Sequence, residues 1–202
     1  MAIKRSTDQA WRVMPVKSSP RVDVARELAH ALLGGVGNRL EHSAAVARRA
    51  EKLAADLPEP LPPGEHELLV VAAWLHDVGY ATEVGDAGFH PLDGARYLRA
   101  QGWPDRVCAL VAHHSGARFA AAELGLTEQL EEFRYEQSAV SDLLTYADQT
   151  IGPNGQPMTV AARMAEMLAR HGESSVQARI HQVRGPFLLA VADRVERRLA
   201  PV

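Results

Sequence analysis

Apolar residues recur at three- and four-residue intervals along most of this chain, and short runs rich in glycine and proline separate the periodic segments. This spacing places apolar side chains on one face of an α-helix. No segment shows the strict alternation that is typical of a half-buried β-strand. The pattern predicts helices over residues 21–33, 38–57, 65–78 and 90–101, a helix after Pro104 that ends at His113-His114, short helices within 118–133, a helix over 138–150, and two or three more after residue 157.

Capping residues and helix breakers set the expected bounds. Asn38 followed by Glu41 is typical of a capping box at the start of the second helix. Gly79 is expected to end the third helix, and Pro91 is typical of a first helical turn, which puts His90 at or beside a helix start. The remaining breakers are expected to bound the last helices: Gly172, Gly185 and Pro186.

Residues 1–20 show no sustained period and end in Ser-Ser-Pro, so we predict a flexible N-terminal arm. Over the whole chain of 202 residues, hydrophobic residues make up 47% but aromatic residues only 5%. Together with the helical pattern, this composition favours an all-α fold whose helices pack closely on small side chains.

Charge and cysteine content exclude several function classes. The formal net charge of −3 offers no basic surface for nucleic acid, and no stretch approaches the roughly 18 apolar residues of a membrane span. Cys108 is the single cysteine, which excludes a disulfide framework and cysteine-based metal clusters. The N-terminus carries no apolar signal segment, so we expect a cytoplasmic protein that binds neither nucleic acid nor a membrane.

The candidate chemistry begins at the pair His76-Asp77, which follows an apolar run over residues 70–75. Two ionisable residues at the end of a buried helix are unfavourable unless a partner satisfies them. A divalent metal would do so, because neutral imidazole and carboxylate are the ligands that zinc, manganese, iron and nickel prefer. His42 and Asp148 lie on two other predicted helices and could complete a site with open coordination positions.

The order of these four residues and the segments around them resemble the HD-domain superfamily of metal-dependent phosphohydrolases. The segments are AWLHDVGY, at residues 73–80, and LTYAD, at residues 144–148. The resemblance covers residues 21–151. It implies an all-α HD-domain helical bundle, with residues 152–202 as a C-terminal helical extension packed on the same domain.

Three more histidines match positions at which binuclear branches of this superfamily carry extra ligands, namely His90, His113 and His114. The resemblance therefore implies two divalent transition-metal ions, drawn from Fe, Mn, Co, Ni and Zn. One ion would take His42, His76, Asp77 and Asp148, and the second would share Asp77 and add His90 with His113 or His114. We prefer His113 as the ligand, from its spacing to Gly116. His114 then joins the metal shell or faces the substrate phosphate.

The implied mechanism is attack of a metal-activated water on a phosphoryl group, with Asp77 as the bridging, catalytic carboxylate. Arg118 follows the turn over residues 113–116 and is the candidate for contact with the phosphate. A similar histidine-containing turn followed by arginine occurs in the symmetrical dinucleoside-tetraphosphate hydrolases of this superfamily. The remaining histidines are expected at the surface: His30, His66, His171 and His181.

Departures from other branches narrow the substrate. No Gly-Tyr-Pro motif follows His113-His114, which disfavours the HD-GYP cyclic-dinucleotide enzymes, and no acidic pair follows Asp77, which disfavours the guanosine tetraphosphate hydrolases. The expected substrate is a phosphorylated small molecule of the nucleotide class. A mononuclear deoxynucleotidase, a di-iron oxygenase of the HD type and a non-catalytic nucleotide-sensing module stay open, as does the oligomeric state, with a dimer among the options.

Overall fold

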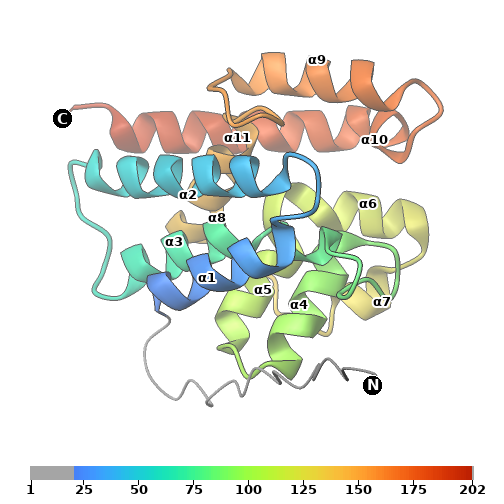
Figure 1. Ribbon diagram of the computed structural model, residues 1–202. Helices are drawn as coiled ribbons and strands as arrows, with labels where there is room; N and C mark the ends of the chain where they lie inside the picture. The colour runs from blue at the N-terminus through green and yellow to red at the C-terminus, as the bar shows by residue number, and fades with distance from the viewer. Residues whose placement is uncertain (1–20, 202) are drawn as a thin grey trace, which may run out of the picture.

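The computed structural model describes residues 21–201, so the predicted arm over residues 1–20 lies outside the described residues. The helices are α1 Val22–Leu33, α2 Arg39–Ala55, α3 Glu65–Leu75, α4 His90–Ala100, α5 Asp105–His113, α6 Ala117–Leu124, α7 Thr127–Leu130, α8 Ala139–Gln149, α9 Val160–His171, α10 Val176–Arg179 and α11 His181–Leu199, with the 3-10 turns η1 Val78–Tyr80 and η2 His114–Gly116 (Figure 1). Within residues 21–201 the only extended pairing is an isolated bridge between Ile151 and Pro157, so the predicted all-α fold is confirmed.

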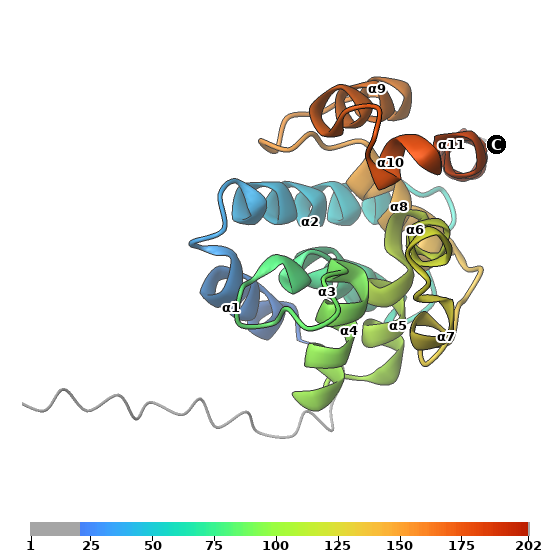
Figure 2. The same cartoon turned by 90° about the vertical axis from the view of Figure 1, so that its right-hand side faces the viewer.

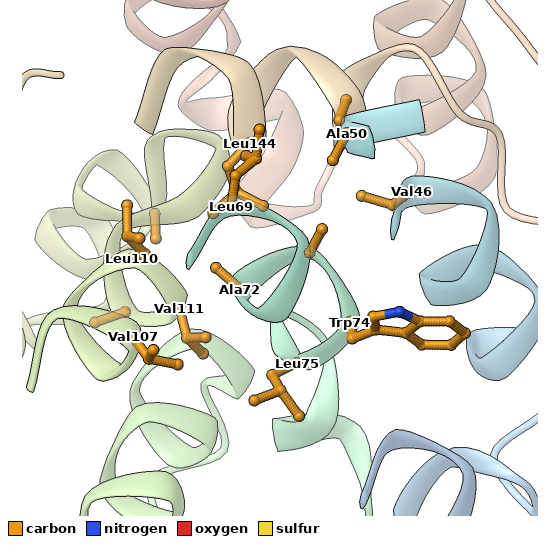
Figure 3. Packing of buried hydrophobic residues seen from close by; sticks show 14 of the residues in the cluster. Val46, Ala50, Leu69, Ala72, Trp74, Leu75, Val107, Leu110, Val111 and Leu144 are labelled. Atoms are coloured by element: carbon orange, nitrogen blue, oxygen red, sulfur yellow. The ribbon is translucent and has the colours of Figure 1, made fainter. Parts of the chain in front are cut away.

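Helix α3 is the centre of the hydrophobic core. All eight of its residues from 68 to 75 are buried, and the helix packs against α1, α2, α5 and α8. Leu69, Ala72 and Leu75 point toward neighbouring helices that contribute Val111 and Leu144, among others (Figure 3). A helix that is apolar all round is buried all round. The position of α3 fixes where the polar pair that follows it, His76-Asp77, must lie.

The C-terminal helices form a layer on one side of the bundle. Figure 2 shows α9, α10 and α11 together above α2, with α8 reaching up to them from below. Helix α11 packs against α8, and Asp142 of α8 accepts hydrogen bonds from Arg194 and Arg198 of α11 at 2.6–2.9 Å. None of the described helices is both long enough and apolar enough to cross a membrane.

One expected helix cap and two expected element bounds were wrong. Asn38 has φ −94° and ψ 17° and makes no capping bond, because its amide instead donates to the side chain of Asn154. Helix α3 ends at Leu75 rather than at residue 78, since the chain tightens into η1. Helix α11 runs through Gly185 and Pro186, a proline lacking the N–H that would bond the preceding turn.

Candidate metal centre

Six side chains from five helices converge beyond the C-terminal end of α3. His42 lies in the first turn of α2, His76 caps α3 and Asp77 follows it. His90 begins α4, His114 follows α5, and Asp148 lies in the last turn of α8. Their ligand atoms form two groups, in each of which all atoms lie within 4.8 Å of one another: His42, His76 and Asp148 in the first, and Asp77, His90 and His114 in the second. Each group could hold a metal ion.

The backbone fixes the rings of three of these histidines. Nδ1 of His42, His76 and His114 lies 3.0, 2.8 and 2.6 Å from the carbonyl oxygens of Gly152, Ala73 and Val111, respectively. A carbonyl oxygen only accepts, so each Nδ1 carries the proton, and Nε2 of neutral His76 and His114 presents a lone pair.

The His76 Nε2 atom tests whether a metal fits this cluster. It is buried and has no hydrogen-bond partner among the described residues. Nε2 of His90 and Nε2 of His114 lie 3.4 Å apart in the same cluster. Metal-ligating histidines typically donate the other ring N–H to a backbone carbonyl or carboxylate, as His76 and His114 do. The donor set therefore fits a bound metal ion.

Asp77 lies between the two groups. Its Oδ1 is 3.5 Å from Nε2 of both His76 and His90, and its Oδ2 is 3.9 Å from Nε2 of His42. Arg39, one turn before His42 on α2, donates to the same Oδ2 at 3.0 Å. A carboxylate in this position can offer one oxygen to each group, as the bridging role predicted for Asp77 requires.

The electrostatics favour, in four of these groups, the protonation states that metal ligands need. Burial raises the pKa of the Asp77 and Asp148 carboxyls, but the facing histidines, and Arg39 beside Asp77, outweigh burial and hold both pKa values below the usual range. Burial lowers the pKa of His90 and of His114. Metal binding requires ionised carboxylates and neutral imidazoles.

His42 differs from the other histidines in its balance of forces. Burial lowers its pKa, but the hydrogen bond from its Nε2 to Asp148 Oδ1, 3.0 Å long, outweighs burial, so the net shift of the pKa is upward. The negative carboxylate attracts a positive charge to this point. A metal ion between His42 and Asp148 would supply that charge in place of the proton.

The second oxygen of Asp148 is held by neighbouring polar groups. Its Oδ2 accepts a short hydrogen bond from Ser115 Oγ and another from Gln149 Nε2 at 2.8 Å. Ser115 has φ 51° and Gly116 φ 70°, both in the left-handed region. This turn aims the Ser115 hydroxyl at Asp148 and leaves the other carboxylate oxygen, Oδ1, facing the histidines.

Gly79 allows the turn that carries Asp77 to touch the helix that carries His90. A Cβ at residue 79 would lie 2.0 Å from the carbonyl oxygen of His90 and 2.7 Å from the amide nitrogen of Gly94. Only a residue without a side chain permits this approach. The glycine after the His76-Asp77 pair therefore lies inside η1 rather than at the end of α3, and it allows the close approach of η1 to α4.

Of the neighbours His113 and His114, only His114 joins the cluster, which is one of the two positions predicted for it. His114 Nε2 faces the cluster, whereas Nε2 of His113 donates to the carbonyl oxygen of Phe133 at 2.8 Å and its ring lies against Tyr135. The preference for His113 as a ligand is therefore corrected. Helix α5 ends at His113, and the chain then turns into η2, which sends the two side chains in different directions.

Arg118 does not reach the cluster. It is exposed, and its guanidinium lies 4.8–5.1 Å from the ring centres of Phe119, Tyr135 and Phe187. It is absent from the residues that line the cleft beside the metal ligands, so the predicted phosphate contact is not supported by its position. His171, expected at the surface without a role, is exposed and lines that cleft.

The cleft is lined by basic side chains that the sequence analysis missed. It is open to solvent and is lined by five of the six candidate ligands. Among the described residues around it, the only acidic ones are Asp77 and Asp148. Four arginines also line it: Arg39, Arg163, Arg170 and Arg184. Only Arg39 has a local signal, because it precedes His42 by three residues and shares its helix face.

Comparison with known proteins gives one match. A family model described as HD domain matches residues 39–198, which include the C-terminal helices beyond residue 151. No curated protein and no solved structure matches the chain. The match spans most of the sequence and includes all six clustered residues. The chain therefore belongs to the HD domain family.

Proposed function

We propose that this protein is a metal-dependent phosphohydrolase that cleaves a phosphate ester or anhydride of a nucleotide-like small molecule with a metal-activated water. The HD domain family includes metal-dependent phosphohydrolases. The observation that carries the proposal is that two groups of candidate metal ligands and four arginines share one cleft. Imidazole and carboxylate suit transition metals, and an arginine fork suits phosphate oxygens.

The proposed cofactor is a pair of divalent transition-metal ions. The first would be held by His42, His76 and Asp148, and the second by His90 and His114, with Asp77 offering an oxygen to each. When bound, such ions would lower the pKa of a water molecule toward neutrality and supply the nucleophile.

The protein's own groups would orient and neutralise the substrate. Arg39 donates to Asp77 Oδ2 at 3.0 Å, and its guanidinium lies 3.7 Å from the centre of the Tyr80 ring, which in turn stacks on His90 at 3.9 Å. This stack holds a positive charge at the edge of the ligand cluster. A phosphoryl oxygen beside Asp77 would meet this guanidinium without any rearrangement of the backbone.

Phosphate release tests the proposal. Protein purified without chelator and supplied with manganese, cobalt or iron is assayed against a panel of nucleotides. We expect release of phosphate from at least one nucleotide, and loss of at least about 100-fold in Asp77→Asn, because removing one electrostatic stabiliser of a reaction typically costs this much. Asp56→Asn is the control, since Asp56 is an exposed carboxylate at the end of α2, the helix that carries His42.

Two results would contradict the proposal. If no nucleotide in the panel releases phosphate, and the protein holds iron tightly and shows a visible absorption band, a di-iron oxygenase is favoured. Equal activity of Asp77→Asn and the wild type would remove the metal cluster from the reaction.

A further inference from the structure

Arg184 of α11 is a buried cation with no carboxylate partner among the described residues. It is 9% exposed. Its Nε donates to the carbonyl oxygen of Ser115 at 2.8 Å, and its Nη1 lies 3.3 Å from Met167 Sδ and 3.4 Å from Gln177 Oε1. These partners are neutral. A buried charge without a counter-ion is unfavourable, and the side chain nonetheless lines the cleft.

Arg163 of α9 is the second buried cation that lines the cleft, on the wall formed by α9 and α11. It is 7% exposed, and its Nε has no hydrogen-bond partner among the described residues. Its Nη1 pairs with Glu166, which also accepts from Arg170 Nε at 2.7 Å. Arg163 and Arg170 thus share one carboxylate and Arg184 has none, so two of the three positive charges on α9 and α11 are not compensated.

The wall is connected directly to the metal ligands. Arg184 holds the carbonyl oxygen of Ser115, and the hydroxyl of the same Ser115 holds Asp148. One residue therefore separates the arginine from a candidate metal ligand. An anion bound at Arg184 and Arg163 would lie in the same cleft as the reacting phosphate but would be bound by different residues.

We propose that Arg163 and Arg184, with Arg170 at the rim, form a second anion subsite that binds a distal phosphate of a substrate whose reacting phosphate lies at the metal centre. The inference rests on the proposed function and narrows it: the substrate class is a chain of two or more phosphates, not a monophosphate ester. Two buried guanidinium groups match the several oxygens of such a chain, which stay ionised at neutral pH.

A binding experiment tests the subsite without turnover. The full chain, loaded with manganese, is titrated by calorimetry with the non-hydrolysable bis-methylene analogue of tripolyphosphate and, separately, with methylphosphonate. We expect the wild type to bind the triphosphate analogue more tightly. Arg184→Gln and Arg163→Gln should each weaken that binding by about 10-fold or more, because each removes a charge-assisted hydrogen bond, and should leave methylphosphonate binding within about twofold.

Controls separate a lost contact from a damaged fold. Arg118→Gln removes an exposed arginine outside the cleft and should bind both probes as the wild type does. Arg170→Gln tests the same wall from its rim, where the side chain is 36% exposed, so it serves if a buried variant unfolds. Thermal unfolding by circular dichroism reports the fold of each variant.

The outcomes distinguish this inference from the proposed function. The subsite is overturned if the folded variants bind the triphosphate analogue as tightly as the wild type does, even if monophosphates are hydrolysed. These variants are Arg184→Gln, Arg163→Gln and Arg170→Gln. Selective loss of triphosphate binding in these variants supports the subsite even if no nucleotide is hydrolysed.

Discussion

Replacing Gly79 with alanine would force the turn that carries Asp77 away from the helix that begins at His90. The added Cβ would lie 2.0 Å from the His90 carbonyl oxygen and 2.7 Å from the Gly94 amide nitrogen. Both are backbone atoms, so no side chain can rotate aside. Since non-bonded carbon atoms pack at about 3.5–4.0 Å, η1 and α4 must separate by about 1 Å or more.

The Gly79→Ala substitution should lower both the stability of the fold and the affinity for metal. Overpacking a well-packed site costs about 1–3 kcal/mol, and a clash with backbone belongs at the upper end of that range. In a chain of this size about 3 kcal/mol lowers Tm by about 6–12 °C. The displaced carboxylate also loses its distances to both ligand groups, so we expect manganese affinity to fall by about 10-fold or more.

Circular dichroism and calorimetric titration with manganese measure the two effects. Gly35→Ala is the matched control, because a Cβ at residue 35 meets no atom within 4 Å and its backbone lies outside the left-handed region. That variant should change stability by less than about 1 kcal/mol. If Gly79→Ala has the same Tm and the same manganese affinity as Gly35→Ala, close packing of η1 on α4 does not set the geometry of the centre.

Three further predictions follow from the positions of side chains. His114→Ala should reduce the bound metal from two ions per chain to about one, measured by elemental analysis, whereas His113→Ala should retain two; the reverse result would restore the sequence-based ligand choice. Arg118→Ala should leave KM for a hydrolysed nucleotide within about twofold of the wild type, and a tenfold rise would place Arg118 on the substrate. Asp142→Asn should cost about 1 kcal/mol in urea unfolding at pH 7, because its arginine partners are partly exposed and water screens the pair. Burial raises the pKa of Asp142, but Arg194 and Arg198 of α11 outweigh burial and lower this pKa below the ordinary 3.8. The stabilisation is therefore present above pH 3.8 and is lost as pH falls through the lowered pKa of Asp142, so the difference between variant and wild type should shrink as pH falls below 3.8.

The helices were largely predictable because their signals are local. Helix α1 begins one residue after the predicted start and ends at Leu33, as predicted. Ser138 caps α8 through a capping box with Ser141. These features depend on residues within one or two turns, so a single sequence contains the information.

Most of the clustered histidine and aspartate residues were predictable from the sequence, but the choice between two neighbouring histidines was not. His42, His76, Asp77, His90 and Asp148 converge as expected. The choice between His113 and His114 depends on where α5 ends and on the left-handed φ of Ser115, which a serine seldom adopts. Tertiary packing decides such a turn, so spacing alone gave the wrong neighbour.

The arginines on the α9 and α11 wall of the cleft could not be predicted from local sequence signals. Arg163 and Arg184 lie on helices that the sequence analysis placed outside the resemblance, and an arginine on an amphipathic helix is usually exposed. Both are buried because α9 and α11 pack over the end of α8, a contact between segments far apart in the chain. Only the folded chain brings these charges to the metal ligands.

Metal stoichiometry tests the central claim most directly. Full-length protein purified without chelator, and then saturated with manganese, is analysed for metal per chain beside Asp77→Asn and the Asp56→Asn control. The account predicts close to two ions per chain in the wild type and the control, and fewer than two in Asp77→Asn. A wild-type chain that holds no ion at saturating manganese would contradict the metal centre, and a value near one would contradict the pairing of two ligand groups through Asp77.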